Sequence, residues 1–151
     1  MDYTPNCLSW NDSLLLGHAA MDAEHEIFVT LVAAMQGAAD HELPALLSAL
    51  LEHATAHFAT ENASMAATNF PARDCHVQEH EAVLATLRGV HLRLGRREHG
   101  VARAVAAELA VWFPAHVQHL DSALSHWISK QRYGGKPIVI HRRRTTEPVP
   151  A

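Results

Sequence analysis

The stretch LPALLSALLEHATAHFATE, residues 43–61, decides the fold class of this chain. Its apolar residues recur at steps of three and four, the period of an α-helix that buries one face. The stripe continues through Ala54 into His57 and Glu61, so ionisable side chains occupy positions that should face a core. Pro44 is acceptable because it falls in the first helical turn. The stretch therefore predicts a helix that carries polar chemistry on its buried face.

Three further stretches show the same helical period, at residues 22–37, about 71–95 and about 99–133. The connectors between the four predicted helices are short, at 37–42, 68–73 and 95–99. Short connectors join antiparallel neighbours. The sequence thus predicts an all-α fold, an antiparallel up-down-up-down four-helix bundle. Because His116 and Asp121 are five residues apart, they would lie about 140° apart on an ideal helix. Pro114 cannot donate to Ala110, so we expect a local irregularity here, such as a wide turn.

The two ends of the chain are predicted to lie outside the bundle. The first twenty residues lack the helical period and should form an irregular N-terminal arm, whereas residues 136–151 are polar and basic and should form a flexible C-terminal tail. We therefore expect one domain over residues 1–135, which is long enough to bury a core without staples. Cys7 and Cys75 are far apart in the sequence and are expected to be free thiols.

Composition excludes several function classes. The formal net charge of −4 gives no general attraction to nucleic acid or to an anionic membrane, and the Arg142–Arg144 run is expected to be a solvated part of the tail. The start MDYTPNCLSW lacks a basic segment followed by an apolar run, so no secretory signal is predicted. No apolar stretch is long enough to span a bilayer. A cytoplasmic location is the expectation.

Histidine is unusually frequent, with 13 in 151 residues. A lone histidine on an apolar face is usually satisfied by a hydrogen bond, and a single HxxxH pair arises by chance in so histidine-rich a chain. Here, however, ionisable residues fall on the buried stripes of all four predicted helices. They cannot easily satisfy one another, and metal coordination is the usual resolution. These residues are His25, His57, Glu61, His76, His80 and His116.

The joint order of these residues resembles the hemerythrin family, in particular its short bacterial members. A single histidine on the first helix is followed by HxxxE, HxxxH and HxxxxD elements, which here are His25, His57/Glu61, His76/His80 and His116/Asp121. The resemblance runs from about Leu8 to about Trp127, with Trp10, Gly17 and Asp22 placed as in the family's N-terminal arm. One departure is Asn62, because many relatives carry an acidic residue directly after the bridging glutamate.

The resemblance implies a centre of two non-haem iron ions with a hydroxo or oxo bridge. One iron would be held by His76, His80 and His116, and the other by His25 and His57. Glu61 and Asp121 would bridge both irons. This ligand count leaves one open position, on the iron of the two histidines, where dioxygen would bind. By their helical positions, Leu31, Phe58, Trp112 and Leu124 are either ordinary core residues or part of an apolar wall that would exclude water from the site.

The function that the resemblance implies is reversible dioxygen binding, for storage, transport or delivery to an oxygen-requiring enzyme partner. The chain would then be a monomeric binding protein rather than an enzyme. Alternatives on the same scaffold are an oxygen or redox sensor and a di-iron oxidase or peroxidase. Oxygen-activating bundles use mainly carboxylates, whereas this set of five histidines and two carboxylates should disfavour O–O cleavage. The roles of His18 and His53 stay open, and His119 and His126 are expected on outer faces of the bundle.

Overall fold

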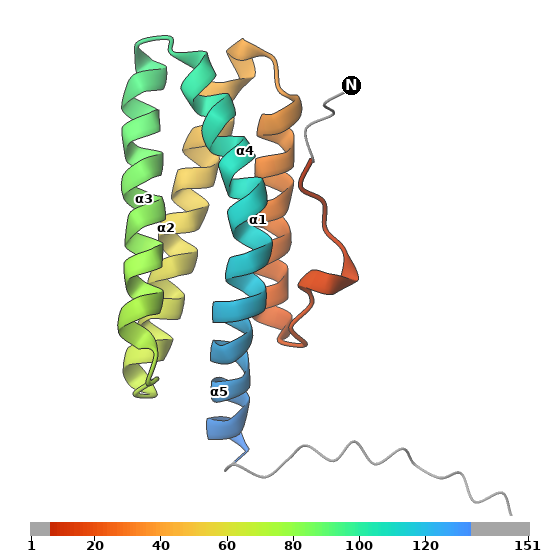
Figure 1. Cartoon of the computed structure of the whole chain (residues 1–151), viewed down its shortest axis with the longest axis vertical. Helices are drawn as coiled ribbons and strands as arrows, with labels where there is room; N and C mark the ends of the chain where they lie inside the picture. Colours follow the sequence, from red (N-terminus) through yellow and green to blue (C-terminus); the bar gives the residue numbers. More distant parts are fainter. Residues whose placement is uncertain (1–6, 134–151) are drawn as a thin grey trace, which may run out of the picture.

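Four long helical segments alternate in direction in the computed structural model, which describes residues 7–133 (Figure 1). They are α1 (Ala19–Gly37), α2 (Leu43–Ala67), α3 (Arg73–Gly95) and a last segment of α4 (His99–His116), the turn η3 (Val117–Asp121) and α5 (Ser122–Arg132). Within residues 7–133 there is no β-strand. The all-α bundle is therefore confirmed. The predicted tail at 136–151 lies outside the described residues, and the domain limit at 135 stays a prediction.

The N-terminal arm packs along α1 and is irregular, as predicted, apart from the short turn η1 (Asp12–Leu14) (Figure 1). Leu8 and Leu14 of the arm are buried in the core, and the Leu8 N–H donates to Gln36 Oε1 at 2.8 Å. Gly17 joins arm to helix with a φ of +75°, a conformation that favours glycine. The arm thus forms part of the folded unit.

Helix α1 begins at Ala19, three residues before the stripe that predicts it, because two side chains organise its first turn. His18 caps the helix, its Nδ1 accepting from the Met21 N–H at 3.2 Å. The Asp22 carboxylate accepts from the N–H groups of Leu16 and Gly17, at 2.9 and 3.1 Å. His18 therefore has a structural role at the helix start, and Asp22 ties the arm to α1.

The last segment contains the irregularity that the His116–Asp121 spacing predicts. Residues Val117–Asp121 form a π-turn, and the N–H of Ser122 bonds to the carbonyl of Val117, five residues before it. Pro114 lies one turn upstream, inside α4. A π-turn adds a residue to the helical repeat, so it turns Asp121 towards the face that carries His116. The prediction of a wide turn is confirmed.

The core divides into layers along the bundle. Its largest part lies near the α1–α2 connector and is built from fully buried aliphatic residues, including Val32, Met35, Leu43, Leu47, Leu50 and Leu87. A smaller apolar cluster at the other end comprises Met21, Met65, Phe70 and Leu124. Met21 lies one turn before His25, and Met65 one turn after Glu61. A polar layer is therefore enclosed between two apolar ones.

Candidate metal centre

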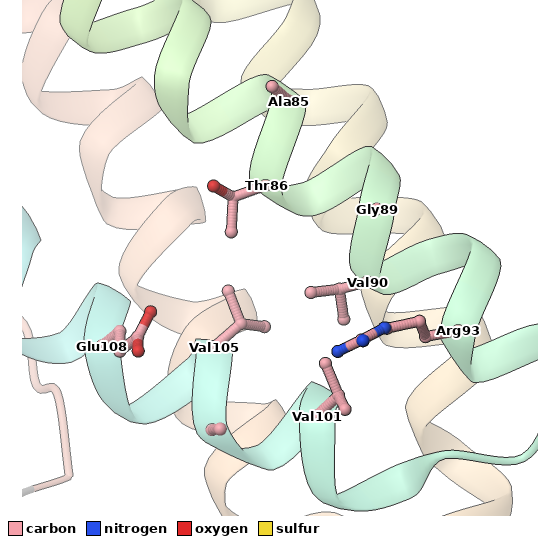
Figure 2. Close-up of a pocket in the computed structure, with 9 residues that line it drawn as sticks. Ala85, Thr86, Gly89, Val90, Arg93, Val101, Val105 and Glu108 are labelled. Carbon is pink, nitrogen blue, oxygen red and sulfur yellow. The ribbon is translucent and has the colours of Figure 1, made fainter.

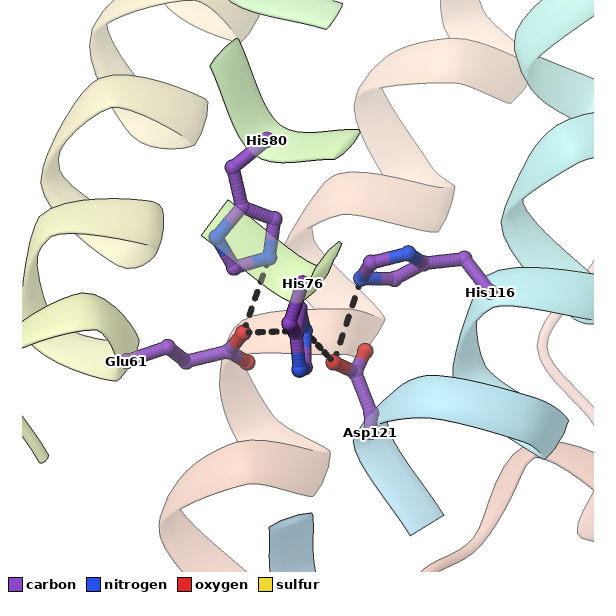
Figure 3. A group of neighbouring side chains, drawn as sticks. All are labelled: Glu61, His76, His80, His116 and Asp121. Carbon is purple, nitrogen blue, oxygen red and sulfur yellow. Dashed lines mark ion pairs between the residues drawn. The ribbon is translucent and has the colours of Figure 1, made fainter. Parts of the chain in front are cut away.

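All seven residues that the sequence singles out lie in this polar layer. Each has at most 5% of its surface exposed, and all four helical segments contribute. We call them the ligand layer: His25, His57, Glu61, His76, His80, His116 and Asp121. Figure 3 shows five of them, with the imidazoles of His76, His80 and His116 directed at the two carboxylates. Residues from four separate segments therefore converge on one buried point.

The Asp121 carboxylate faces imidazoles on two sides. Its Oδ1 lies 2.9 Å from His76 Nε2 and 3.1 Å from His116 Nε2. Its Oδ2 lies 3.1 Å from His25 Nε2. The π-turn makes this possible, since it directs Asp121 into the layer beside His116. The Asp121 carboxylate thus lies between the imidazoles of His76 and His116 on one side and that of His25 on the other.

The two carboxylate oxygens of Glu61 also face different imidazoles. Its Oε1 lies 2.8 Å from His57 Nε2, and its Oε2 lies 3.2 Å from His80 Nε2. Each carboxylate therefore turns one oxygen towards a group of three imidazoles and the other towards a group of two. The larger group is His76, His80 and His116, and the smaller is His25 and His57. Two metal ions sharing both carboxylates would fit this arrangement.

The hydrogen bonding of the layer tests whether its residues fit a metal. Although these nitrogens and oxygens are close, seven inward-facing atoms make no hydrogen bond: the Nε2 atoms of His25, His76, His80 and His116, both Glu61 oxygens and Asp121 Oδ1. Leaving buried polar atoms unsatisfied costs about 1–3 kcal/mol each. Imidazole nitrogens and carboxylate oxygens are first-row transition-metal ligands. The donor set therefore fits metal coordination.

Without metal, the ionisation of the layer depends on contacts between imidazoles and carboxylates. Burial lowers the pKa of His25, but the adjacent carboxylates of Asp121 and Glu61 outweigh it and raise that pKa to about 9. The pKa of His76 rises to about 9 for the same reasons. Burial would raise the pKa of Glu61 and Asp121, yet the surrounding histidines hold both pKa values well below their usual range. For His80, burial dominates and lowers the pKa.

Two side chains bind the ring nitrogens that face away from the carboxylates. His116 Nδ1 donates to Glu79 Oε1 at 2.9 Å, and that oxygen also accepts from Trp112 Nε1 at 2.9 Å. His80 Nδ1 donates to Asn62 Oδ1 at 2.8 Å. Glu79 was not singled out by the sequence. The available signal was its position on α3, three residues after His76 and directly before His80.

Aromatic rings cover the larger imidazole group. Phe58 stacks on His80 with ring centroids 4.0 Å apart, and Trp112 stacks on His116 at 4.3 Å. Leu124 is fully buried in the smaller apolar cluster, whereas Leu31 packs against the main apolar core. Two of the four candidate wall residues thus contact the ligand layer directly.

The remaining histidines differ in their distance from the layer. His119 and His126 are exposed, as expected. His53 is only 13% exposed; its Nε2 donates to the backbone carbonyl of Glu24 at 2.9 Å, and its ring stacks near that of His57. The Glu24 carboxylate lies 3.6 Å from His53 Nδ1 and 4.0 Å from His57 Nδ1. His53 therefore lies beside the layer rather than in it.

Surface hollows distinguish the two sides of the layer. One of about 430 Å³ lies between α1, α2 and α5, and His57 and Glu61 are among its lining residues. Another of about 350 Å³ lies between α3 and α4, with Arg93 and Glu108 at its edges (Figure 2). No residue of the ligand layer lines this second hollow. Of these two hollows, the one between α1, α2 and α5 reaches the ligand layer, at His57 and Glu61.

Comparison with known proteins decides the family. Residues 16–128 match the model described as the hemerythrin HHE cation binding domain. The chain belongs to the hemerythrin family. A bacteriohemerythrin from Ralstonia nicotianae is 37% identical to this chain over 124 residues, which cover 82% of the chain and 90% of that relative. No solved structure gave a significant match. In the part of the chain that the structure describes, no helix has the length and apolar character needed to cross a bilayer.

Proposed function

We propose that this protein holds two non-haem irons in the ligand layer and binds dioxygen reversibly, for storage, transport or delivery. The observation that carries the proposal is the division of Glu61 and Asp121 between three imidazoles on one side and two on the other. Family membership supports the same reading, since the sequence order of the seven residues follows the family's pattern. The match to a bacteriohemerythrin over most of both chains adds to this support.

The proposed roles follow from which atoms face each other. His76, His80 and His116 would hold one iron, His25 and His57 the other, and Glu61 and Asp121 would bridge the pair together with a hydroxide or oxide. Two ferrous ions bring four positive charges, and two carboxylates with one hydroxide offset three. The buried layer would then stay near neutrality, as its low-dielectric surroundings require.

When bound, the iron pair supplies the electrons and the open position that dioxygen needs. The chain itself contributes shape and exclusion of water. With two imidazoles instead of three, the smaller group leaves one position free, and the hollow between α1, α2 and α5 reaches His57 on that side. On the other side, Phe58 and Trp112 stack on the imidazoles of His80 and His116 at 4.0 and 4.3 Å. The aromatic contacts of the smaller group are looser, with Phe113 edge-on to His25 at 5.4 Å and Phe58 tilted to His57 at 5.9 Å. We therefore infer that dioxygen approaches from the side of His25 and His57.

A second candidate is a di-iron oxidase or peroxidase, and a third is an oxygen or redox sensor. The hollow beside His57, at about 430 Å³, is larger than dioxygen requires, and this is the observation that favours an oxidase, which needs room for a second substrate. The ligand set favours binding over oxidation, because five imidazoles and two carboxylates provide less negative charge than the carboxylate-rich sets of oxygen-activating bundles. The monomeric state and an oxygen-requiring enzyme partner stay predictions.

The test is an absorption spectrum of protein reduced without air, exposed to dioxygen and returned to vacuum, with iron counted per chain. We expect two irons and a visible charge-transfer band that appears with dioxygen and disappears under vacuum. The exposed-site variant His119→Ala should behave as the wild type. Oxidation that vacuum does not reverse would overturn reversible binding in favour of an oxidase or a sensor.

A further inference from the structure

The ring nitrogens that face away from the ligand layer have unequal partners. Glu79 offers a carboxylate to His116, and Asn62 offers a neutral amide oxygen to His80, at similar distances of 2.9 and 2.8 Å. The Nδ1 atoms of His25 and His76 are buried without a hydrogen-bond partner in the described structure. In the larger imidazole group, His116 therefore has a charged partner, His80 has a neutral partner, and His76 has none in the described structure.

Glu79 also joins two helices. Its Oε1 accepts from both Trp112 and His116, which lie one turn apart on α4, while Glu79 itself is on α3. The Trp112 ring stacks on the His116 ring. This contact lies directly before the π-turn, where the backbone departs from the regular helix. Glu79 therefore fixes both the rotation of the His116 ring and the nitrogen that carries its proton.

A hydrogen bond from an imidazole to a carboxylate has an electronic consequence. The carboxylate draws the Nδ1 proton towards itself, which increases electron density on Nε2 and makes that nitrogen a stronger donor to a metal. A stronger donor favours the ferric over the ferrous state. A neutral amide in the same position orients the ring with a smaller electronic effect. Since Glu79 is 34% exposed, solvent reduces its effect without removing it.

We propose that Glu79 and Asn62 are positioning residues for His116 and His80, and that the charge of Glu79 lowers the reduction potential of the iron held there. The proposal rests on the proposed di-iron centre and assigns a role to two residues outside it. Glu79 orients His116 and increases its donor strength, whereas Asn62 orients His80 alone. Charge beside the same metal can therefore be changed independently at Glu79 and at Asn62.

The decisive experiment changes charge in opposite directions at these two points. Glu79→Gln keeps a hydrogen-bond acceptor but removes the charge, and Asn62→Asp adds a charge opposite His80. Midpoint potentials of the iron-loaded variants are measured without oxygen. We expect the potential to rise in Glu79→Gln and to fall in Asn62→Asp. The matched control, Glu81→Gln, removes the same charge from an exposed position on α3 and should leave the potential near that of the wild type.

Iron affinity tests the positioning role separately. Glu79→Ala removes the acceptor and should weaken iron binding about ten- to hundredfold, whereas Glu79→Gln should retain most of the affinity. Wild-type affinity in Glu79→Ala would overturn the positioning role. Equal shifts in Glu79→Gln and Glu81→Gln, or a rise in Asn62→Asp, would overturn the electronic role. If Glu79→Ala does not fold, the iron affinity of Asn62→Ala tests the positioning role at His80 in its place, and a wild-type affinity there would overturn it. Asn62→Asp and Glu79→Gln decide the electronic role in either case.

These measurements do not depend on the fate of dioxygen. A failure of reversible oxygenation would leave the anaerobic potentials and affinities unchanged, and would count against the proposed function alone. Wild-type protein that binds no iron would instead remove the basis of both proposals.

Discussion

Two regions of this bundle are equally buried but are stabilised differently. The main apolar core and the ligand layer are built on the same helices, and both exclude solvent almost completely. In the core, Leu43, Leu47 and Leu87 are stabilised by removal of apolar surface from water. In the ligand layer, His80 and Asp121 carry buried polar atoms without hydrogen bonds. The core is complete with protein atoms alone, whereas polar atoms of the ligand layer lack hydrogen-bond partners among the described residues, as the proposed metal centre would explain.

Removing the metals should change the stability of the protein more than any other change considered below, because it acts on the ligand layer and leaves the apolar core intact. Ligands that bind only the folded state stabilise it by about 4 kcal/mol for each site at a thousandfold excess over Kd. We expect the free energy of unfolding to fall by at least this amount when a chelator strips the protein, as measured by chemical denaturation. A Glu61→Ala variant, which should already lack the metal pair, should respond little to the chelator. An unchanged transition in the wild type would contradict a metal-dependent layer.

The second largest effect is a dependence of metal affinity on pH, which arises from histidines of the ligand layer. His25 and His76 have pKa values raised from 6.5 to about 9, so the metal-free protein keeps their protons at neutral pH and must release them to bind iron. Apparent metal affinity should rise with pH up to about 9, by about tenfold per pH unit for each proton released. Calorimetry in buffers of different ionisation enthalpy measures the protons released. Binding at pH 7 with no proton release would contradict the raised pKa values.

The same raised pKa values make the stability of the metal-free protein fall with rising pH, whereas metal affinity rises. The stability that these two protonated histidines contribute is complete below pH 6.5 and is lost as the pH rises through 9. Unfolding of the stripped protein at pH 6.5 and pH 9 therefore provides an independent check.

A substitution in the main apolar core should destabilise the protein without affecting the metals. Leu47 is fully buried, and Leu47→Ala should lower the free energy of unfolding by about 2–5 kcal/mol. The iron content of the folded variant should equal that of the wild type, because Leu47 lies on the apolar side of the layer. Loss of iron from a variant that remains folded would show that the two regions are not separable.

The smallest expected effect concerns the N-terminal arm. Asp22→Ala removes two hydrogen bonds from the N–H groups of Leu16 and Gly17, and should cost about 1–2 kcal/mol in thermal or chemical unfolding. The control Glu52→Ala, at an exposed position on α2, should change stability by less than about 0.5 kcal/mol. Equal effects in both variants would show that the arm contributes little.

The features that the sequence predicted correctly are those set within one helix. The apolar period predicted the four helical segments, and the His116–Asp121 spacing beside Pro114 predicted the wide turn. Contacts between helices were not predictable in the same way, because they depend on how each helix is rotated and shifted against its neighbours. The hydrogen bond from His116 to Glu79 is one example, and the partly buried position of His53 beside Glu24 is another.

The seven-residue set could be predicted for a further reason. Ionisable side chains on buried stripes need a common partner, so their order along the chain carried information that single spacings lacked. The structure brings all seven together, and their action as metal ligands remains a proposal. The direction of each carboxylate oxygen could not be predicted, since it depends on side-chain rotamers across four helices.

The most direct test of the account is the iron content per chain of the wild type and three variants, loaded and purified in parallel without oxygen. We predict two irons in the wild type and in His119→Ala, and loss of the iron pair in Glu61→Ala and Asp121→Ala. Circular dichroism should show that each variant is helical before its iron is counted. Two irons in both carboxylate variants, or equal loss in His119→Ala, would contradict the claim that this buried layer holds the metals.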